Sequence, residues 1–201
     1  MMIKQRSWGD CGIATLINAV SDNRFTYFNG PGGYERLVEL FEGRNSGITI
    51  QEVSATLFFC GFTPLYLPLS GFRTESGISN AHVIHTEIMD YAMKGEKAVL
   101  QVKTKSGLLH LVYFDGRNIW DPSPNSGEHP VLSDYESIVD AVFFKRAKKR
   151  CWLKDYTRSA IPKVTTLGRK IAFELRVFAG NPTARKIAEY EKSRKSRSGD
   201  L

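Results

Sequence analysis

Near the N-terminus, three stretches space their apolar side chains as helices do. Residues 11–20 form a nearly unbroken apolar run behind Asp10, which is placed to cap a helix. Residues 34–41 carry apolar side chains at positions 34, 37, 38 and 41, which share one helical face. Thr49 precedes a third such stretch, 50–59, and is a second candidate cap. The pattern predicts three helices that pack together.

Further along the chain, the apolar stretches shorten and predict strands. Residues 109–114 and 119–121 flank an Asp-Gly-Arg-Asn sequence, which is typical of a tight hairpin turn. An earlier short strand, 63–67, is expected to be broken by Pro64 and Pro68. Helices followed by antiparallel strands predict an α+β fold. The other expected elements are a loop at 70–82, a helix at 83–93, a strand at 98–103, and a last helix and strand within 134–144.

Charge divides the chain into two parts. Residues 1–144 hold 11 Lys and Arg against 16 Asp and Glu, a formal charge of −5, whereas residues 145–201 hold 17 against 5, a formal charge of +12. We therefore expect one folded domain at 1–148 and a basic, largely helical extension at 149–201.

The basic extension contains two candidate helices. Residues 166–178 have an apolar stripe, and residues 183–195 have only a thin apolar seam. The extension is either a solvated charged segment or a surface that contacts nucleic acid or an acidic protein. No aromatic residue follows Tyr190, which argues against stacking on bases.

Cysteine and histidine usage argues against disulfides and metal. The chain has three cysteines, and an odd number does not suit a disulfide framework. Cys60 lies in an apolar run and Cys151 among basic residues, and we expect both to be structural. His82 and His85 have metal-ligand spacing only on a helix and lack a nearby third ligand. We therefore expect no metal and no cofactor.

Hydropathy gives a further expectation about location. No apolar run approaches the ~20 residues that a membrane-spanning helix needs. The N-terminus lacks an apolar signal region. We expect no membrane span, and a chain that is cytoplasmic as synthesised.

The candidate chemistry begins at the start of the first predicted helix. Cys11 lies there, where unpaired N–H groups and the helix dipole favour a thiolate. Gln5 lies six positions upstream, and its amide can help those N–H groups to hold an oxyanion. Gly12 is expected to let a carbonyl approach the sulfur without meeting a side chain. This layout suits a cysteine hydrolase.

Such a nucleophile needs a base, and the base needs a group that orients it. His110 lies near the start of one hairpin strand and Asp121 near the end of the other, so we expect them to be cross-strand neighbours. A carboxylate there would fix the imidazole tautomer and stabilise the imidazolium. Taken singly, each residue has a commoner role: Cys11 as a small buried hydrophobe, His110 as an ordinary strand residue and Asp121 as a turn former.

The two motifs together resemble the C39-like branch of the papain-like cysteine peptidases. The residues that carry the resemblance are, in order, Gln5, Asp10-Cys11-Gly12, Ala14, His110 and Asp121-Pro122. It covers roughly residues 1–144 and implies a papain-like fold, in which a helical half with the nucleophile packs on an antiparallel sheet that carries His and Asp. It also implies that Cys11 is the nucleophile, His110 the general base and acid, Asp121 the orienting group and Gln5 the oxyanion donor.

The resemblance implies a thiol-dependent hydrolase, a cysteine peptidase that acts on a peptide or protein. Deamidases, acyltransferases and peptidoglycan endopeptidases share this machinery, and an inactive homologue is a further alternative. Relatives on bacteriocin exporters cut after a double glycine, but no membrane-spanning segment accompanies the motifs here. A different class of function is a papain-like structural or binding subunit of a larger assembly, for example a phage virion, whose basic extension contacts nucleic acid or an acidic partner.

Overall fold

The computed structural model describes residues 2–25, 28, 31–41, 47–85, 94–126 and 130–147. The boundary expected between residues 148 and 149, Cys151 and the two helices expected in the basic extension lie outside these residues, and so does most of the helix expected at 83–93. These expectations stay predictions.

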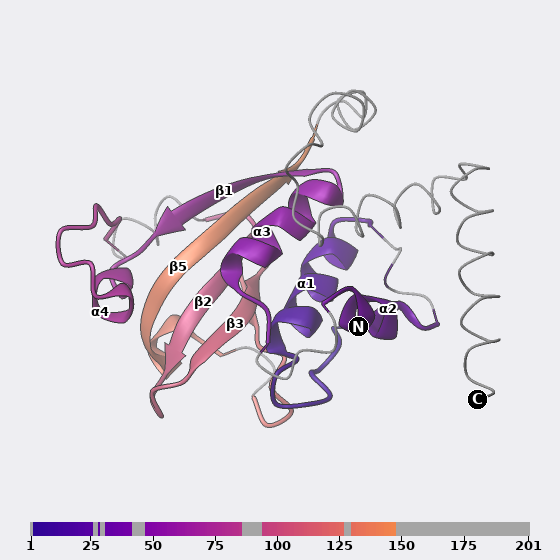
Figure 1. Cartoon of the computed structure of the whole chain (residues 1–201), viewed down its shortest axis with the longest axis horizontal. Helices are drawn as coiled ribbons and strands as arrows, with labels where there is room; N and C mark the ends of the chain where they lie inside the picture. Colours follow the sequence, from indigo (N-terminus) through magenta and orange to yellow (C-terminus); the bar gives the residue numbers. More distant parts are fainter. Residues whose placement is uncertain are drawn as a thin grey trace, which may run out of the picture. The chain divides into compact units, whose positions relative to one another are not determined.

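An antiparallel sheet of five strands forms the centre of the described structure (Figure 1). Its order is β1-β5-β2-β3-β4, so the last strand lies between the first and the second. The strands are β1 (Phe62–Pro68), β2 (Ala98–Thr104), β3 (Leu109–Phe114), β4 (Ile119–Trp120) and β5 (Tyr135–Arg146). Because β5 lies second in this order, it brings residues from the end of the domain beside the His110 hairpin.

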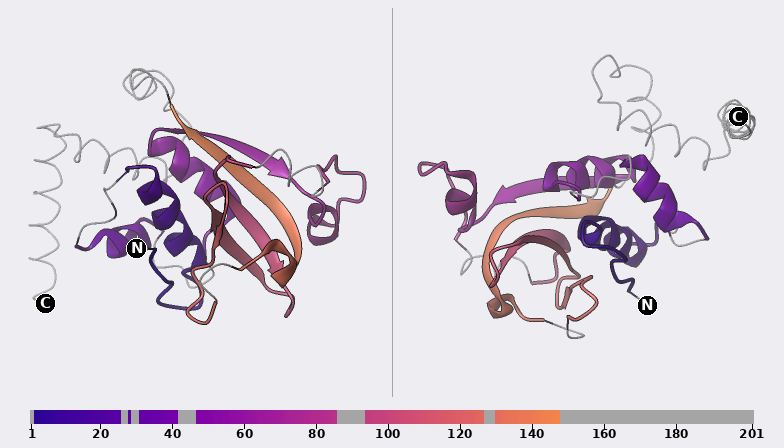
Figure 2. Two further views of the ribbon diagram at one scale, coloured as in Figure 1. Left: turned by 180° about the vertical axis from the view of Figure 1, so that it is seen from behind. Right: turned by 60° about the horizontal axis from the view of Figure 1, so that its bottom comes forward.

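Helices cover one face of this sheet (Figures 1 and 2). Helix α1 (Cys11–Asp22) packs against β3, helix α3 (Ile50–Phe59) packs against β1, and α2 (Gly33–Leu40) packs against α1. Residues 12–20 of α1 are all buried, which explains why its apolar run is almost unbroken. The expected α+β arrangement, a helical half packed on an antiparallel sheet, is confirmed.

The other face of the sheet is also closed to solvent. Side chains from all three middle strands form a second core there. A strand with both faces buried has no reason to alternate apolar and polar side chains. The core residues are Leu69, Ala98, Leu100, Val102, Val112, Ile119, Tyr135, Ile138 and Ala141.

Of the two expected helix caps, one forms. The hydroxyl of Thr49 accepts the N–H of Glu52 at 3.3 Å, and the Glu52 carboxylate accepts the N–H of Thr49 at 2.9 Å, a reciprocal capping box. Asp10 occupies the N-cap position of α1, but its side chain makes no capping bond. The expected position of Asp10 is confirmed, but its carboxylate does not take up the N–H groups that begin α1.

Four local expectations fail, and strand pairing explains three of them. Strand β1 runs unbroken through Pro64 to Pro68, since it is an edge strand paired only with β5. The helix expected within 134–144 is absent, and β5 occupies that segment after a single 3₁₀ turn at Leu132–Asp134. Residues 70–82 contain a short helix, α4 (Phe72–Ser76), and Val83–His85 are not helical, because Ile84 forms a bridge with Leu69.

Candidate active site

Close packing of α1 against β3 places Cys11 at the candidate site. Cys11 is the first residue of α1, and one turn later the hydroxyl of Thr15 donates to the carbonyl of Leu111 at 2.8 Å. A Cβ at Gly12 would lie 2.4 Å from Cγ1 of Ile48 and 3.0 Å from Cδ1 of Leu111. Gly12 is thus required for the approach of α1 to its neighbours, a reason that the sequence did not reveal. The thiol is thereby held beside the start of β3.

The structure joins His110 to Asp121. Nε2 of His110 lies 2.9 Å from Oδ1 of Asp121, and the two side chains are only 10% and 8% exposed. Asp121 follows β4 directly, and the β3–β4 register pairs Tyr113 with Trp120. Continuing that register places Asp121 opposite Val112, two residues from His110 on the same face. The two residues are therefore diagonal neighbours across the hairpin.

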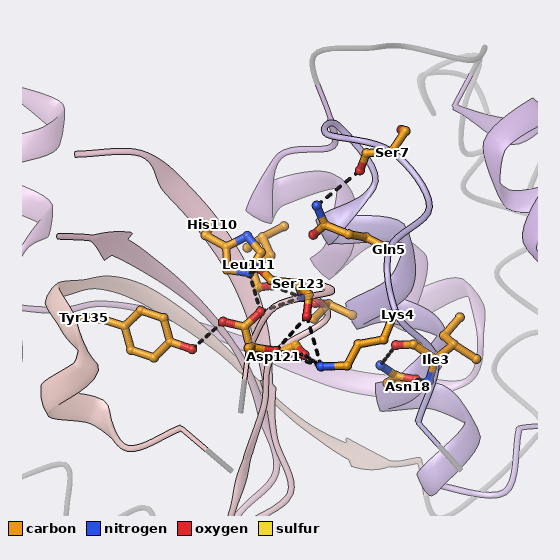
Figure 3. A network of polar contacts seen from close by, with 12 residues as sticks. Ile3, Lys4, Gln5, Ser7, Asn18, His110, Leu111, Asp121, Ser123 and Tyr135 are labelled. Atoms are coloured by element: carbon orange, nitrogen blue, oxygen red, sulfur yellow. Dashed lines mark hydrogen bonds and ion pairs between the residues drawn. The ribbon is translucent and has the colours of Figure 1, made fainter. Parts of the chain in front are cut away.

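Both oxygens of the Asp121 carboxylate have donors (Figure 3). Oδ1 accepts the backbone N–H of Ser123 at 2.7 Å, and Oδ2 accepts the hydroxyl of Tyr135 at 2.7 Å. The Ser123 hydroxyl also lies 3.1 Å from Nε2 of His110. Burial raises the pKa of Asp121, but the hydrogen bonds and the charge of His110 outweigh it and the pKa is lowered. The carboxylate is thus kept ionised.

The protons of the site are distributed as a cysteine nucleophile requires. Burial lowers the pKa of His110, but Asp121 and Cys11 outweigh it and raise the pKa to about 9. Burial raises the pKa of the Cys11 thiol, but the His110 side chain and the backbone of Leu111 and Gly12 outweigh it, so the pKa is lowered. Since Nε2 of His110 faces Asp121 and Ser123, Nδ1 is the nitrogen left for the thiol. The arrangement favours a thiolate beside an imidazolium.

A buried asparagine and a lysine fix the N-terminal segment beside the site. The Asn18 amide bonds both the N–H and the carbonyl of Ile3, at 2.8 and 3.0 Å. Nζ of Lys4 donates to the carbonyls of Asp121 and Ser123, both at 3.0 Å, and to the hydroxyl of Ser126 at 2.7 Å. Gln5 therefore follows a segment that is tied to the same loop as Asp121.

Gln5 lies in the cleft with Cys11, and its side chain also bonds the neighbouring backbone. Its backbone N–H donates to the carbonyl of Pro122 at 2.8 Å. Its side-chain Nε2 donates to the carbonyl of Ser7 at 3.2 Å (Figure 3), and its Oε1 is buried without a hydrogen-bond partner among the described residues. The bond to Ser7 uses one of the two hydrogens on Nε2, and the second can still be donated to an oxyanion.

A cleft of about 690 Å³ contains all four predicted site residues, Gln5, Cys11, His110 and Asp121. Its rim includes exposed apolar side chains, with Trp8 77% and Leu109 49% exposed. In the part of the chain that the structure describes, no Lys or Arg lines it. A larger hollow of about 790 Å³ lies at the β3–β4 turn and contains no cysteine among its described lining residues.

Two residues of the site were missed by sequence reasoning. Ser123 follows Asp121-Pro122, and an Asp two residues before a Ser was a local signal for the bond between them. Tyr135 begins β5 and reaches Asp121 only because β5 is in the same sheet. No local signal indicated Tyr135.

The other candidate groups are not assembled into a site. Cys60 is buried, and burial raises the pKa of its thiol. His82 and His85 lie in a segment that is not helical. Across the described ranges, no three Cys, His, Asp or Glu side chains gather as a metal site would require. The described helices are all too short or too polar to cross a membrane.

Comparison with known proteins gives one similar fold. No protein-family model and no curated protein sequence matches the chain. Among solved structures, the chain is similar to a double glycine motif protease from an AMS/PCAT transporter, crystallised in complex with the leader peptide. The match covers 73% of this chain and 91% of that one, with 13% identity and a TM-score of 0.48. The roles of the site residues rest on their geometry alone.

Proposed function

We propose that this chain is a thiol-dependent hydrolase, and specifically a cysteine peptidase. The observation that carries the proposal is the connected set of Cys11, His110 and Asp121. The thiol has a lowered pKa beside an imidazole whose own pKa is raised by a buried carboxylate. Purely structural cysteines lack such a partner, as the buried Cys60 thiol with its raised pKa illustrates.

The geometry supports a two-step acyl transfer. His110 takes the Cys11 proton, and the thiolate attacks the amide carbonyl to form a C–S bond. The oxyanion is held by the backbone N–H of Cys11 and by the Nε2 hydrogen of Gln5 that Ser7 does not use. The proton on His110 then passes to the leaving amine as the C–N bond breaks. Water, deprotonated by His110, releases the acyl group and restores the thiol.

Asp121 acts on the base and not on the substrate. Its carboxylate accepts a hydrogen bond from the Nε2–H of His110, so Nδ1 faces the reaction. Deamidases and acyltransferases use the same steps with a different leaving group or acceptor. A peptide or protein substrate is proposed because the cleft is open and has an apolar rim.

The rate of Cys11 alkylation by iodoacetamide as a function of pH tests the proposal, with Cys11 followed by peptide mapping. We expect a rate that stays high well below pH ~8 and falls in His110→Ala, because the imidazolium stabilises the thiolate. A Cys11 that titrates near the free-thiol value of about 8.5 in both proteins would contradict it. That result would favour a structural or binding subunit.

A peptide mixture incubated with the wild-type chain and with Cys11→Ala then tests turnover. New peptide termini should form only with the wild type, as detected by mass spectrometry. Release of ammonia without new termini would instead assign the same site to deamidation.

A further inference from the structure

Asp140 is a buried carboxylate in the same cleft that the proposed mechanism does not use. We propose that Asp140 selects substrates with a cationic side chain, Lys or Arg, by receiving its ammonium or guanidinium group beside the reacting thiol. This inference rests on the proposed function and names a specificity-determining residue for it.

Strand register gives the position of Asp140. Gln101 of β2 pairs with Leu111 of β3 on one side and with Asp140 of β5 on the other. Paired residues point to the same face, and neighbouring strands are about 4.8 Å apart, so Asp140 lies about 10 Å along this row from Leu111. Leu111 contacts the nucleophile helix at Gly12, and all three residues of the row line the cleft. An extended Lys or Arg side chain near the scissile bond covers most of this distance, and the Asp140 side chain covers part of the rest.

Only one oxygen of the Asp140 carboxylate has a hydrogen-bond partner among the described residues. The residue is 3% exposed, and its Oδ2 accepts the hydroxyl of Tyr66 at 2.9 Å. Its Oδ1 is buried and has no hydrogen-bond partner in the described part of the chain. Burial raises the pKa of Asp140 to about 6, with Tyr66 opposing the shift, so the carboxyl is mainly ionised at neutral pH. A buried, unpaired charge is costly unless something compensates it.

The other acidic residues of the cleft already have cationic partners. Asp121 is paired with His110, and Glu75 lies 2.8 Å from Nζ of Lys103. No Lys or Arg among the described residues lines the cleft, as noted above. Asp140 therefore leaves the cleft with a net negative charge that a cationic substrate would neutralise.

A structural role for Asp140 is the competing interpretation. The bond from Tyr66 ties edge strand β1 to β5, and this bond alone would explain a polar residue at position 140. Asp140→Asn separates the two roles, because the amide oxygen can still accept the Tyr66 hydroxyl while the charge is lost. Tyr66→Phe does the reverse when it is measured at about pH 8: it removes a bond that lowers the Asp140 pKa, and at that pH the carboxyl stays ionised without it.

The experiment measures how fast Cys11 reacts with two methanethiosulfonates of similar size, the cationic 2-aminoethyl and the anionic 2-sulfonatoethyl reagent. The thiolate displaces methanesulfinate and forms a mixed disulfide, which peptide mapping assigns to Cys11. In Asp140→Asn the cation-to-anion ratio of rate constants should fall about fivefold, as expected for one charge lost at about 10 Å in a partly aqueous cleft. Tyr66→Phe and Glu75→Gln should each change the ratio less than about twofold, because the charge at Asp140 remains.

An unchanged ratio in Asp140→Asn would overturn the inference, and so would an equal fall in Tyr66→Phe. If Asp140→Asn does not fold, Asp140→Ser takes its place, because it also carries no charge. Its ratio should fall as much, and an unchanged ratio would overturn the inference. Failure of the proposed function would show separately, as an ordinary pH profile of iodoacetamide alkylation in the wild type.

Discussion

Two Cys-Gly pairs lie at opposite ends of their helices, and the pKa values of their thiols shift in opposite directions. Cys11-Gly12 begins α1, and Cys60-Gly61 follows the last turn of α3. The pKa of the Cys11 thiol is lowered, whereas burial raises that of Cys60. Unpaired N–H groups at a helix start favour an anion, and carbonyl groups at a helix end do not. The same dipeptide thus has a thiol with a lowered pKa at one helix start and a buried thiol with a raised pKa at the other helix end.

The two glycines are needed for different reasons. Gly12 is needed for space, since a Cβ there would collide with Ile48 and Leu111. Gly61 is needed for conformation, since its φ of 87° lies in the region that side chains disfavour. Gly12 allows Cys11 to lie close to the sheet, and Gly61 allows the chain to turn from α3 into β1.

The largest expected difference between the two pairs is in thiol reactivity. At pH 6 we expect Cys11 to be alkylated by iodoacetamide at least about a thousandfold faster than Cys60, because Cys60 is both protonated and shielded. Quantitative peptide mapping over time measures both rates in one sample. In about 6 M guanidinium chloride the two rates should converge, since the difference belongs to the fold. Comparable rates in the native protein would remove the contrast.

The second expected difference is in stability. Gly12→Ala should destabilise the domain by about 2–3 kcal/mol, because the new methyl group must displace packed side chains. Gly61→Ala should cost about 1 kcal/mol, the usual strain of a side chain at positive φ. Urea unfolding followed by circular dichroism gives both values. An Ala at position 12 that is tolerated as well as one at 61 would show that α1 can move away from Ile48.

The third expected difference is in the dependence of stability on pH. Asp121, with a lowered pKa, stabilises the fold above its unfolded value of about 3.9 and loses this effect as pH falls. His110, whose pKa is raised to about 9, stabilises below its unfolded value of about 6.5 and loses this effect as pH rises through 9. Both effects are present between about pH 4 and pH 6.5.

Asp121→Asn should therefore lower the Tm most at pH 5–6, where both effects are present. It should lower the Tm least near pH 10, above the His110 pKa of about 9. The measurement is best made in Cys11→Ala protein, so that thiol ionisation does not contribute. Cys60→Ala serves as the comparison, and its Tm change should be independent of pH only below the free-thiol pKa of about 8.5, because burial keeps the folded thiol protonated while the unfolded thiol ionises above that value. A Tm difference for Asp121→Asn that does not vary with pH would contradict the buried ion pair.

The contrast between the two cysteines could largely be predicted from sequence, because its causes are local. Cys11 follows a break in the apolar pattern and starts a helix, and the hairpin that joins His110 to Asp121 closes within a few residues. Cys60 ends an apolar helix, which indicates burial. The cap at Thr49 was predictable for the same reason, since Glu52 is three residues away.

Contributions from β5 could not be predicted in this way. Its acidic start resembles the first turn of a helix, but pairing on both sides with β1 and β2 makes it a strand. Only this non-local pairing brings Tyr135 to Asp121 and Asp140 into the cleft. Local propensity contains no information about such pairing. The sequence therefore predicted that Cys11, His110 and Asp121 lie together, but it did not predict the contributions of Tyr135 and Asp140 from β5.

The smallest expected effect concerns the hydrogen bond from Tyr135 to Asp121, which is compared with the bond from Tyr66 to Asp140. Tyr135→Phe removes the donor to Oδ2 of Asp121, so the Asp121 pKa should be less depressed and acid unfolding should begin about 0.5 pH unit higher. Tyr66→Phe removes an equivalent bond at Asp140, outside the Cys11–His110–Asp121 set. Only Tyr135→Phe should also slow Cys11 alkylation at pH 6, by about threefold, because His110 is then held less firmly. If both variants slowed alkylation equally, Tyr135 would be a general packing residue and Asp121 would orient His110 without it.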